Sequence, residues 1–216
     1  PIKSSAASDV YKRQFQSRKS VLEYDDVMNK QREIIYAQRR QVLDGLDIKE
    51  TVLNMMHTSV SNHVALAFGE NQQLDAAQYH EMLKGMEGIY FAKGAVEFSD
   101  EEIPSKTQED FDEAFIAAAE KTYEAKEQEV TTPIMRELER VIMLRVVDEY
   151  WMDHIDAMDD LKQGVRLQGY GNNNPVDVYK RESLDMFEEM VSAIQDETVR
   201  RLYSVRLLSL IHISEP

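Results

Sequence analysis

The chain has 216 residues, with 40 acidic against 25 basic side chains and a formal net charge of -15 at pH 7. Its hydrophobic fraction of 43% suffices for a packed core and is too high for a disordered acidic tail. The acidic balance argues against a nucleic-acid partner, because phosphate binding needs clustered lysine and arginine. The lack of cysteine excludes disulfides, thiolate zinc sites and thiol nucleophiles.

The first expected element is a long helix over residues 17–44, where an apolar residue recurs every seven positions. The recurring residues are Val21, Met28, Ile35 and Val42. A second helix is expected to begin with a capping box formed by Asp47 and Glu50 and to end near Phe68. Glycine and proline are few, eight and five residues, which favours helices over a turn-rich β fold.

The middle of the chain is less regular and strongly acidic. Residues 74–84 are expected to form a short helix, and residues 85–98, with three glycines, an irregular segment or another short helix. Residues 97–129 carry twelve acidic and three basic side chains. Within that stretch Thr107 is expected to cap a helix that ends near Glu129.

The last part of the chain predicts an antiparallel pair of long helices. The first is expected to start at Thr132 as its cap, with Pro133 at the first helical position, and to stop at Gly169. The second is expected to start at Asn174 as its cap, followed by Pro175. Because a short loop joins two long helices, we expect a hairpin. The predicted fold class is therefore all-α.

Only one cluster of polar side chains resembles a metal site. Glu149, Asp153 and Asp156 share one helix face next to His154, and such ligands suit a hard or borderline metal. The alternative is a solvated acidic face opposite an apolar seam, and this alternative is favoured because no second helix offers a matching set of ligands. The chain contains no phosphate-binding loop and no nucleophile elbow. We therefore assign no catalytic, metal-binding or cofactor-binding residue.

Two further sets of residues are candidates for a role in function. Tyr170 lies between Gly169 and Gly171 at the expected tip of the hairpin, where an exposed aromatic side chain is suited to contact with a partner. Packing of the tip tyrosine back onto its own helices is the alternative. The seam of the hairpin is expected to be core, and its central residues are Trp151, Ile155 and Met158.

Two stretches of the sequence resemble the SecA family, the motor ATPases of bacterial preprotein translocation. The first is residues 18–32, RKSVLEYDDVMNKQR, and the second lies within residues 144–180 and includes WMDHIDAM and GYG. Their order and spacing agree with the C-terminal helical region of that family, and the resemblance covers roughly residues 17–206. The resemblance assigns three parts to the chain. Residues 17–45 would be part of the long helix of the helical scaffold domain, 46–131 the helical wing domain, and 132–206 the two-helix finger with the remaining scaffold. Residues 1–16 and 207–216 are expected to be non-native ends, because both ends break the helical periodicity and resemble translated adaptor sequence.

The resemblance also implies a function for the fragment. The finger tip of the family contacts the moving preprotein in the mouth of the SecY channel, and that position falls on Tyr170. The implied partners are therefore the SecY channel complex, preprotein substrates and the motor domains of the same SecA-like chain. The expected location is the cytoplasm, peripherally at the cytoplasmic face of the bacterial inner membrane. ATP and Mg would belong to motor domains that this fragment lacks. The rival interpretation is a free-standing coiled-coil adaptor that binds partner helices.

Overall fold

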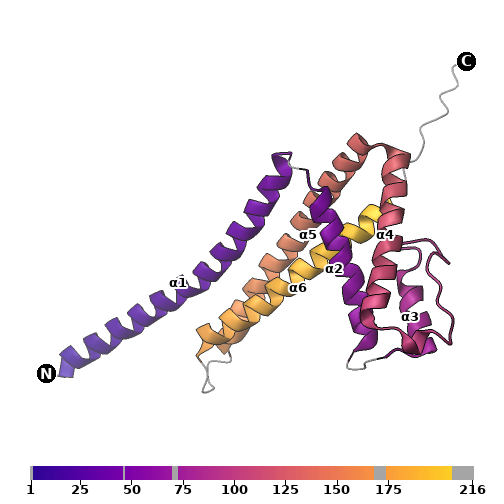
Figure 1. Cartoon of the computed structure of the whole chain (residues 1–216). Coiled ribbons are helices and arrows are strands. Elements are labelled where there is room, and N and C mark those ends of the chain that lie inside the picture. The colour runs from indigo at the N-terminus through magenta and orange to yellow at the C-terminus, as the bar shows by residue number, and fades with distance from the viewer. Residues whose placement is uncertain (1, 46, 70–72, 168–173, 206–216) are drawn as a thin grey trace, which may run out of the picture. The chain divides into compact units, whose positions relative to one another are not determined.

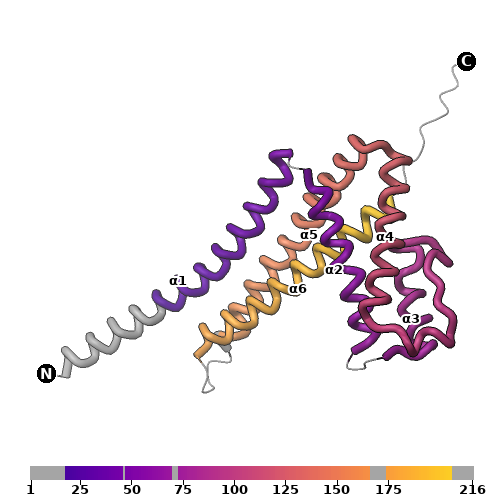
Figure 2. Tube along the Cα trace, in the orientation of Figure 1, coloured from indigo at the N-terminus to yellow at the C-terminus, as the bar shows by residue number. Residues whose placement is uncertain are grey.

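The computed structural model describes four segments of the chain (Figure 1). They are residues 2–45, 47–69, 73–167 and 174–205. The side chains described are those of residues 18–45, 47–69, 73–165 and 174–205, which are coloured in Figure 2.

The described residues form six α-helices and one short 3-10 helix, and an isolated bridge between Glu87 and Phe91 is their only β pairing. The all-α prediction is therefore confirmed. The elements are α1 (Ile2–Leu43), α2 (Lys49–Phe68), α3 (Ala76–Met86), η1 (Ile103–Ser105), α4 (Gln108–Val130), α5 (Thr132–Leu167) and α6 (Pro175–Ser204). None of the described helices is both long enough and apolar enough to cross a membrane.

Two of the expected helix caps are present. At the start of α4, Thr107 Oγ1 accepts a hydrogen bond from the Asp110 amide at 3.3 Å, and an Asp110 carboxylate oxygen accepts one from the Thr107 amide at 2.7 Å. The latter bond lowers the pKa of Asp110, since it favours the charged form. At the start of α6, Asn174 Oδ1 accepts from the Val176 amide at 3.2 Å, and Pro175 is the first helical residue. Both helices thus begin where the sequence indicated.

Three other expectations about helix starts were wrong. Helix α1 begins at Ile2 rather than near residue 17. The predicted capping box at α2 does not form, because the helix begins at Lys49 and the Asp47 carboxylate accepts from the Lys49 amide at 3.0 Å. Helix α5 begins at Thr132 itself, because the carbonyl of Thr131 already accepts the first helical bond, from Met135. Thr131 is the single residue between α4 and α5 and has a positive φ of 75°, an uncommon conformation for a β-branched residue.

The chain divides into two compact units, and α5 and α6 contribute residues to both. The hairpin unit comprises Pro1–Asp44 and Val147–Ala193, and the α2–α4 unit comprises Gly45–Val146 and Ile194–Pro216.

In the hairpin unit, apolar residues of three helices share one buried cluster. Tyr24 of α1 meets Tyr179 of α6 edge to face, with ring centroids 4.7 Å apart, and Met158 of α5 belongs to the same cluster. Val165 near the end of α5 and Val176 near the start of α6 also join it. The pairing of late α5 residues with early α6 residues indicates that these helices run antiparallel, as a hairpin requires.

In the α2–α4 unit, aromatic side chains dominate the core. Helix α2 packs along α4 and also contacts α3. Phe111 and Phe115 of α4 are fully buried. Phe115 stacks on Phe91, with ring centroids 5.6 Å apart and nearly parallel planes, and Phe111 lies 5.6 Å from the Tyr79 ring. Because stacked rings bury large apolar areas, α4 anchors this unit.

Truncating the central ring should destabilise the α2–α4 unit. We expect Phe115→Ala to lower the free energy of unfolding by about 3–5 kcal/mol, the usual cost of removing a buried aromatic ring and leaving a cavity. Chemical denaturation followed by far-UV circular dichroism measures the change. Leu66→Ala is the control, because Leu66 is 82% exposed on α2. Equal losses from the two substitutions would contradict this description of the core.

Candidate functional site

The expected finger tip lies outside the described residues, which leaves the contact assigned to Tyr170, Gly169 and Gly171 as a prediction. The expected seam of the hairpin lies within them. Trp151 and Met158 are buried, and Ile155 is partly buried. The joint between α1 and the hairpin contains these seam residues and is therefore the candidate site.

The possible metal ligands do not converge. His154 is only 5% exposed and its Nε2 lies 3.0 Å from Gln31 Oε1 on α1. Asp153 and Asp156 are exposed to solvent. Across the described part of the chain, no group of three or more histidine, aspartate or glutamate side chains is placed to hold a metal ion. The geometry thus assigns His154 to the joint with α1 and not to a carboxylate cluster.

Three buried polar residues, one from each helix of the hairpin unit, form a continuous hydrogen-bonded chain. Gln31 Nε2 donates to the backbone carbonyl of Ser183 on α6 at 3.0 Å, while Gln31 Oε1 faces His154 Nε2. Because the Gln31 amide nitrogen donates to the Ser183 carbonyl, the atom that faces His154 is the amide oxygen, which can only accept. His154 therefore donates to it through Nε2–H. We call Gln31, His154 and Ser183 the polar layer. Burial lowers the pKa of His154, because the imidazolium would lose its hydration.

Aromatic rings enclose the polar layer. The His154 ring lies 5.6 Å from the Trp151 ring and 5.9 Å from the Phe187 ring of α6. Tyr36 of α1 approaches Trp151 edge to face at 6.4 Å. Apolar rings lower the local dielectric, which strengthens the hydrogen bonds and raises the cost of leaving any of them unmade.

Ion pairs on the surface of the hairpin unit connect α1 to α5, the first arm of the hairpin. Arg39 Nε and Nη2 donate to the two carboxylate oxygens of Asp148 on α5 at 2.8 and 3.1 Å, which raises the pKa of Arg39. Lys162 of α5 lies 3.1 Å from Asp25 of α1. These pairs are partly exposed, so each contributes roughly 0–1 kcal/mol. They orient the helices more than they stabilise them.

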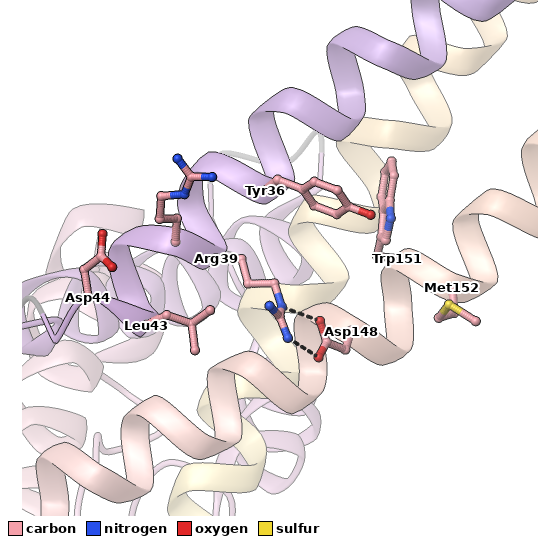
Figure 3. Close-up of a pocket in the computed structure, with 8 residues that line it drawn as sticks. Tyr36, Arg39, Leu43, Asp44, Asp148, Trp151 and Met152 are labelled. Atoms are coloured by element: carbon pink, nitrogen blue, oxygen red, sulfur yellow. Dashed lines mark hydrogen bonds and ion pairs between the residues drawn. The ribbon is translucent and has the colours of Figure 1, made fainter.

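The ion pair between Arg39 and Asp148 lines an open pocket of about 720 Å³ (Figure 3). The lining residues are Tyr36, Arg39, Arg40, Leu43, Asp44, Asp148, Trp151 and Met152. Figure 3 shows Arg39 turned toward Asp148, and the Tyr36 ring pointing toward Trp151. Tyr36, Leu43 and Met152 are exposed, whereas Trp151 is buried and its indole N–H has no hydrogen-bond partner among the described residues. The pocket could therefore take an apolar side chain.

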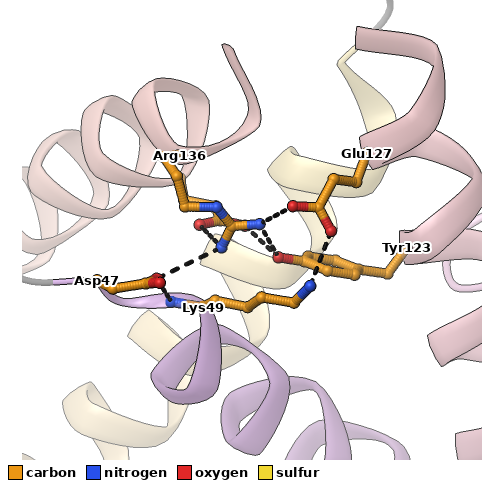
Figure 4. Close-up of polar contacts among 6 residues, drawn as sticks. Asp47, Lys49, Tyr123, Glu127 and Arg136 are labelled. Atoms are coloured by element: carbon orange, nitrogen blue, oxygen red, sulfur yellow. Dashed lines mark hydrogen bonds and ion pairs between the residues drawn. The ribbon is translucent and has the colours of Figure 1, made fainter. Parts of the chain in front are cut away.

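A second polar cluster lies in the α2–α4 unit, where α4, α5 and the start of α2 meet (Figure 4). Glu139 of α5 is fully buried. It accepts hydrogen bonds from the Tyr123 hydroxyl and, at 2.7 Å, from Arg136. Arg136 also donates to the Tyr123 oxygen at 2.9 Å and to Glu127 at 2.6 Å. Lys49 of α2 completes the cluster by donating to Glu127 at 2.8 Å.

The pKa values within this cluster move in opposite directions. Burial raises the pKa of Glu139 and of Tyr123, because an apolar environment disfavours the ionised form of each side chain. The hydrogen bond from Lys49 lowers the pKa of Glu127, which lies nearer the surface. Neither Gln31 nor Glu139 was predicted from the sequence to be a functional or positioning residue. The one sequence signal for Gln31 was its spacing, three residues after Met28 and four before Ile35, which places it on the apolar face of α1.

Comparison with known proteins identifies relatives along almost the whole chain. The model of a family described as the SecA wing and scaffold domain matches residues 4–206. The protein translocase subunit SecA of Acetivibrio thermocellus is 46% identical over 203 residues, which are 94% of this chain and 22% of that protein. The SecA of Desulforudis audaxviator is 43% identical over 94% of the chain, and SecA 1 of Alkaliphilus metalliredigens is 42% identical over 93%. The chain spans less than a quarter of the length of each relative, 22% or 23%.

Removing the hydroxyl from the buried cluster should destabilise the α2–α4 unit. We expect Tyr123→Phe to cost about 1–3 kcal/mol of unfolding free energy, because Glu139 then keeps a buried oxygen without its donor. Tyr150→Phe is a matched control, since the Tyr150 hydroxyl bonds to no other described residue. Urea denaturation compares the two variants. A loss no greater than that of the control would contradict the cluster geometry.

The stability of the hairpin unit should fall in mild acid. A histidine whose pKa is lowered by folding contributes stability that is complete above its ordinary pKa, about 6.5. That stability is lost as the pH falls below this value and through the folded pKa. Urea denaturation between about pH 7.5 and 5.5, followed by the fluorescence of Trp151, the chain's one tryptophan, should show a larger decrease for the wild type than for His154→Gln. Equal decreases would contradict the burial of a neutral His154.

Proposed function

This chain belongs to the SecA wing and scaffold domain family, and from that premise we propose that it transmits movement within a protein translocase subunit to the exported polypeptide. The α2–α4 unit then contributes to the wing. Helix α1 belongs to the scaffold, and the hairpin of α5 and α6 is the finger. The observation that carries the proposal is the polar layer together with the ion pairs around it, because these contacts join α1 to both arms of the hairpin.

Mechanical transmission needs a stiff element that is attached firmly at one place. Helix α1 contacts the hairpin at several levels, through Tyr24 on Tyr179, through Gln31 in the polar layer, and through Arg39 on Asp148. A packed interface that is crossed by buried hydrogen bonds resists sliding and bending. A displacement of α1 is therefore passed on to the hairpin as a whole.

The proposed end of this transmission is the loop between α5 and α6. Tyr170 stands there between two glycines. A tyrosine offers apolar area and a hydroxyl that can donate or accept, so it can grip polypeptides of varied sequence. We propose that Tyr170 contacts the preprotein at the mouth of the SecY channel.

The whole protein would supply what this segment lacks. ATP and Mg²⁺ would bind to motor domains elsewhere in the polypeptide, and those domains would drive α1. The subunit would act at the cytoplasmic face of the bacterial inner membrane, with the channel complex and the preprotein as its partners. These assignments rest on the family and on the relatives that are named as translocase subunits.

A cross-link from position 170 tests the proposal. Residues 18–205 of this chain replace the matching part of a cysteine-free version of the Acetivibrio thermocellus subunit. Tyr170→Cys then introduces a single thiol, because this chain contains no cysteine. With a preprotein stalled in the channel, we expect a cross-link from position 170 and none from the control Met158→Cys, since Met158 is buried in the hairpin unit.

Normal ATP turnover without a cross-link from position 170 would contradict the proposed contact. The adaptor interpretation would be favoured instead if the 216-residue chain bound a separate helical partner tightly and the hybrid subunit showed no transport.

A further inference from the structure

The buried polar residues of the hairpin unit have an arrangement that packing alone does not require. Among the described side chains of this unit, the buried polar residues are Gln31, His154 and Ser183, at 6%, 5% and 1% exposure. Each comes from a different helix, and the Gln31 side chain bonds both to the His154 side chain and to the backbone carbonyl of Ser183. A buried polar group that serves neither catalysis nor metal binding is most useful where it selects one arrangement over its alternatives.

The alternatives in this unit are shifted positions of α1 along the hairpin. The seam of α1 has alternating spacings of three and four residues, and its members are Val21, Tyr24, Met28, Gln31 and Ile35. Such a seam faces its partner equally well after a slip of one turn, because one seam residue replaces the next. Apolar contacts are not directional and discriminate weakly between these positions.

Gln31 carries the buried amide of the seam, and its hydrogen bonds discriminate between them. A slip of one turn in either direction would bring Met28 or Ile35 to its place, and neither side chain can donate to the Ser183 carbonyl. The Met28 thioether is only a weak acceptor and Ile35 is none, so the buried His154 donor would lose its amide acceptor. A slip of a whole heptad would bring Gln38 into the layer, but it would also move Gln31 into the apolar position of Tyr24. Each shifted arrangement is therefore penalised.

We propose that the polar layer fixes the axial register of α1 against the hairpin, and that Gln31 is the positioning residue that sets how far the hairpin tip advances. The role of Gln31 in setting the advance of the hairpin tip deepens the proposed function and rests on it. The register itself belongs to this chain alone and is tested without a motor or a channel.

Disulfide formation in the full 216-residue chain reports the register. Glu23 of α1 lies beside Lys180 of α6, with 3.7 Å between the charged atoms. The pair Glu23→Cys and Lys180→Cys therefore reports the native register. The pair Ser20→Cys and Lys180→Cys reports a slip of one turn that brings Met28 into the layer. A disulfide needs close approach of the two residues, so its yield distinguishes these positions.

Both pairs are combined with substitutions in the polar layer. Gln31→Leu removes the discriminating side chain, and the double variant Gln31→Leu with His154→Leu also removes the unpaired donor, so that loss of folding does not obscure the result. We expect the ratio of native to shifted disulfide to fall about tenfold in both variants, the factor that one net hydrogen bond supplies. Gln38→Leu, the same change at an exposed position of α1, should leave the ratio unchanged. A ratio in the double variant equal to that of Gln38→Leu would overturn the register assignment.

Transport by the hybrid subunit tests the positioning role. The double variant should keep its ATP turnover but move less preprotein for each ATP hydrolysed, whereas Gln38→Leu should match the unmodified hybrid. Unchanged transport per ATP, in a variant whose disulfide ratio has fallen, would overturn the positioning role of Gln31. A hybrid with an intact polar layer that never contacts the preprotein from position 170 would instead count against the proposed function, so the two failures are distinguishable.

Discussion

A buried hydrogen-bonding group is costly to leave without a partner, and in the hairpin unit the hydrogen bonds of one buried amide join three helices at one level. Gln31 uses both ends of this amide, one on the Ser183 carbonyl and the other on His154. The aromatic and aliphatic residues above and below this level supply most of the stabilisation through burial, but they do not specify a position along the helix. Apolar packing thus holds α1 on the hairpin, and the polar layer determines where it is held.

The α2–α4 unit contains a related arrangement with charges in place of neutral groups. Glu139 is fully buried and is paired with Arg136 and Tyr123, so its charge is compensated on two sides. Buried ion pairs contribute little net stability, because the cost of removing their hydration offsets the attraction. These pairs instead constrain geometry. Arg136 of α5 donates to Glu127 near the end of α4, and this bond restricts the angle at which the two helices meet around Thr131. Each unit therefore combines an apolar core with directional polar contacts.

Much of the fold was predictable because helices leave local signals. Thr107 and Asn174 were recognised as caps from their neighbours alone, and the seam of the hairpin followed from the spacing of Trp151 and Met158. The register of α1 was not predictable, because it depends on partners of Gln31 that lie 123 and 152 positions away in the sequence. Asp47 was misassigned because a cap depends on which residue begins the helix, and that is settled by packing. The contact at Tyr170 and the domain bounds implied by the family stay predictions.

The central claim is that α1 and the hairpin move as one body, and a distance between them tests it most directly. Spin labels at Arg32 and Leu184, both exposed, can be introduced through cysteines in the cysteine-free hybrid subunit. Double electron–electron resonance then measures their separation with ADP and with a non-hydrolysable ATP analogue. The account predicts one narrow distance distribution that is the same in both states. A second distance, or a shift between the two states, would show that α1 slides or separates during the cycle and would contradict the account.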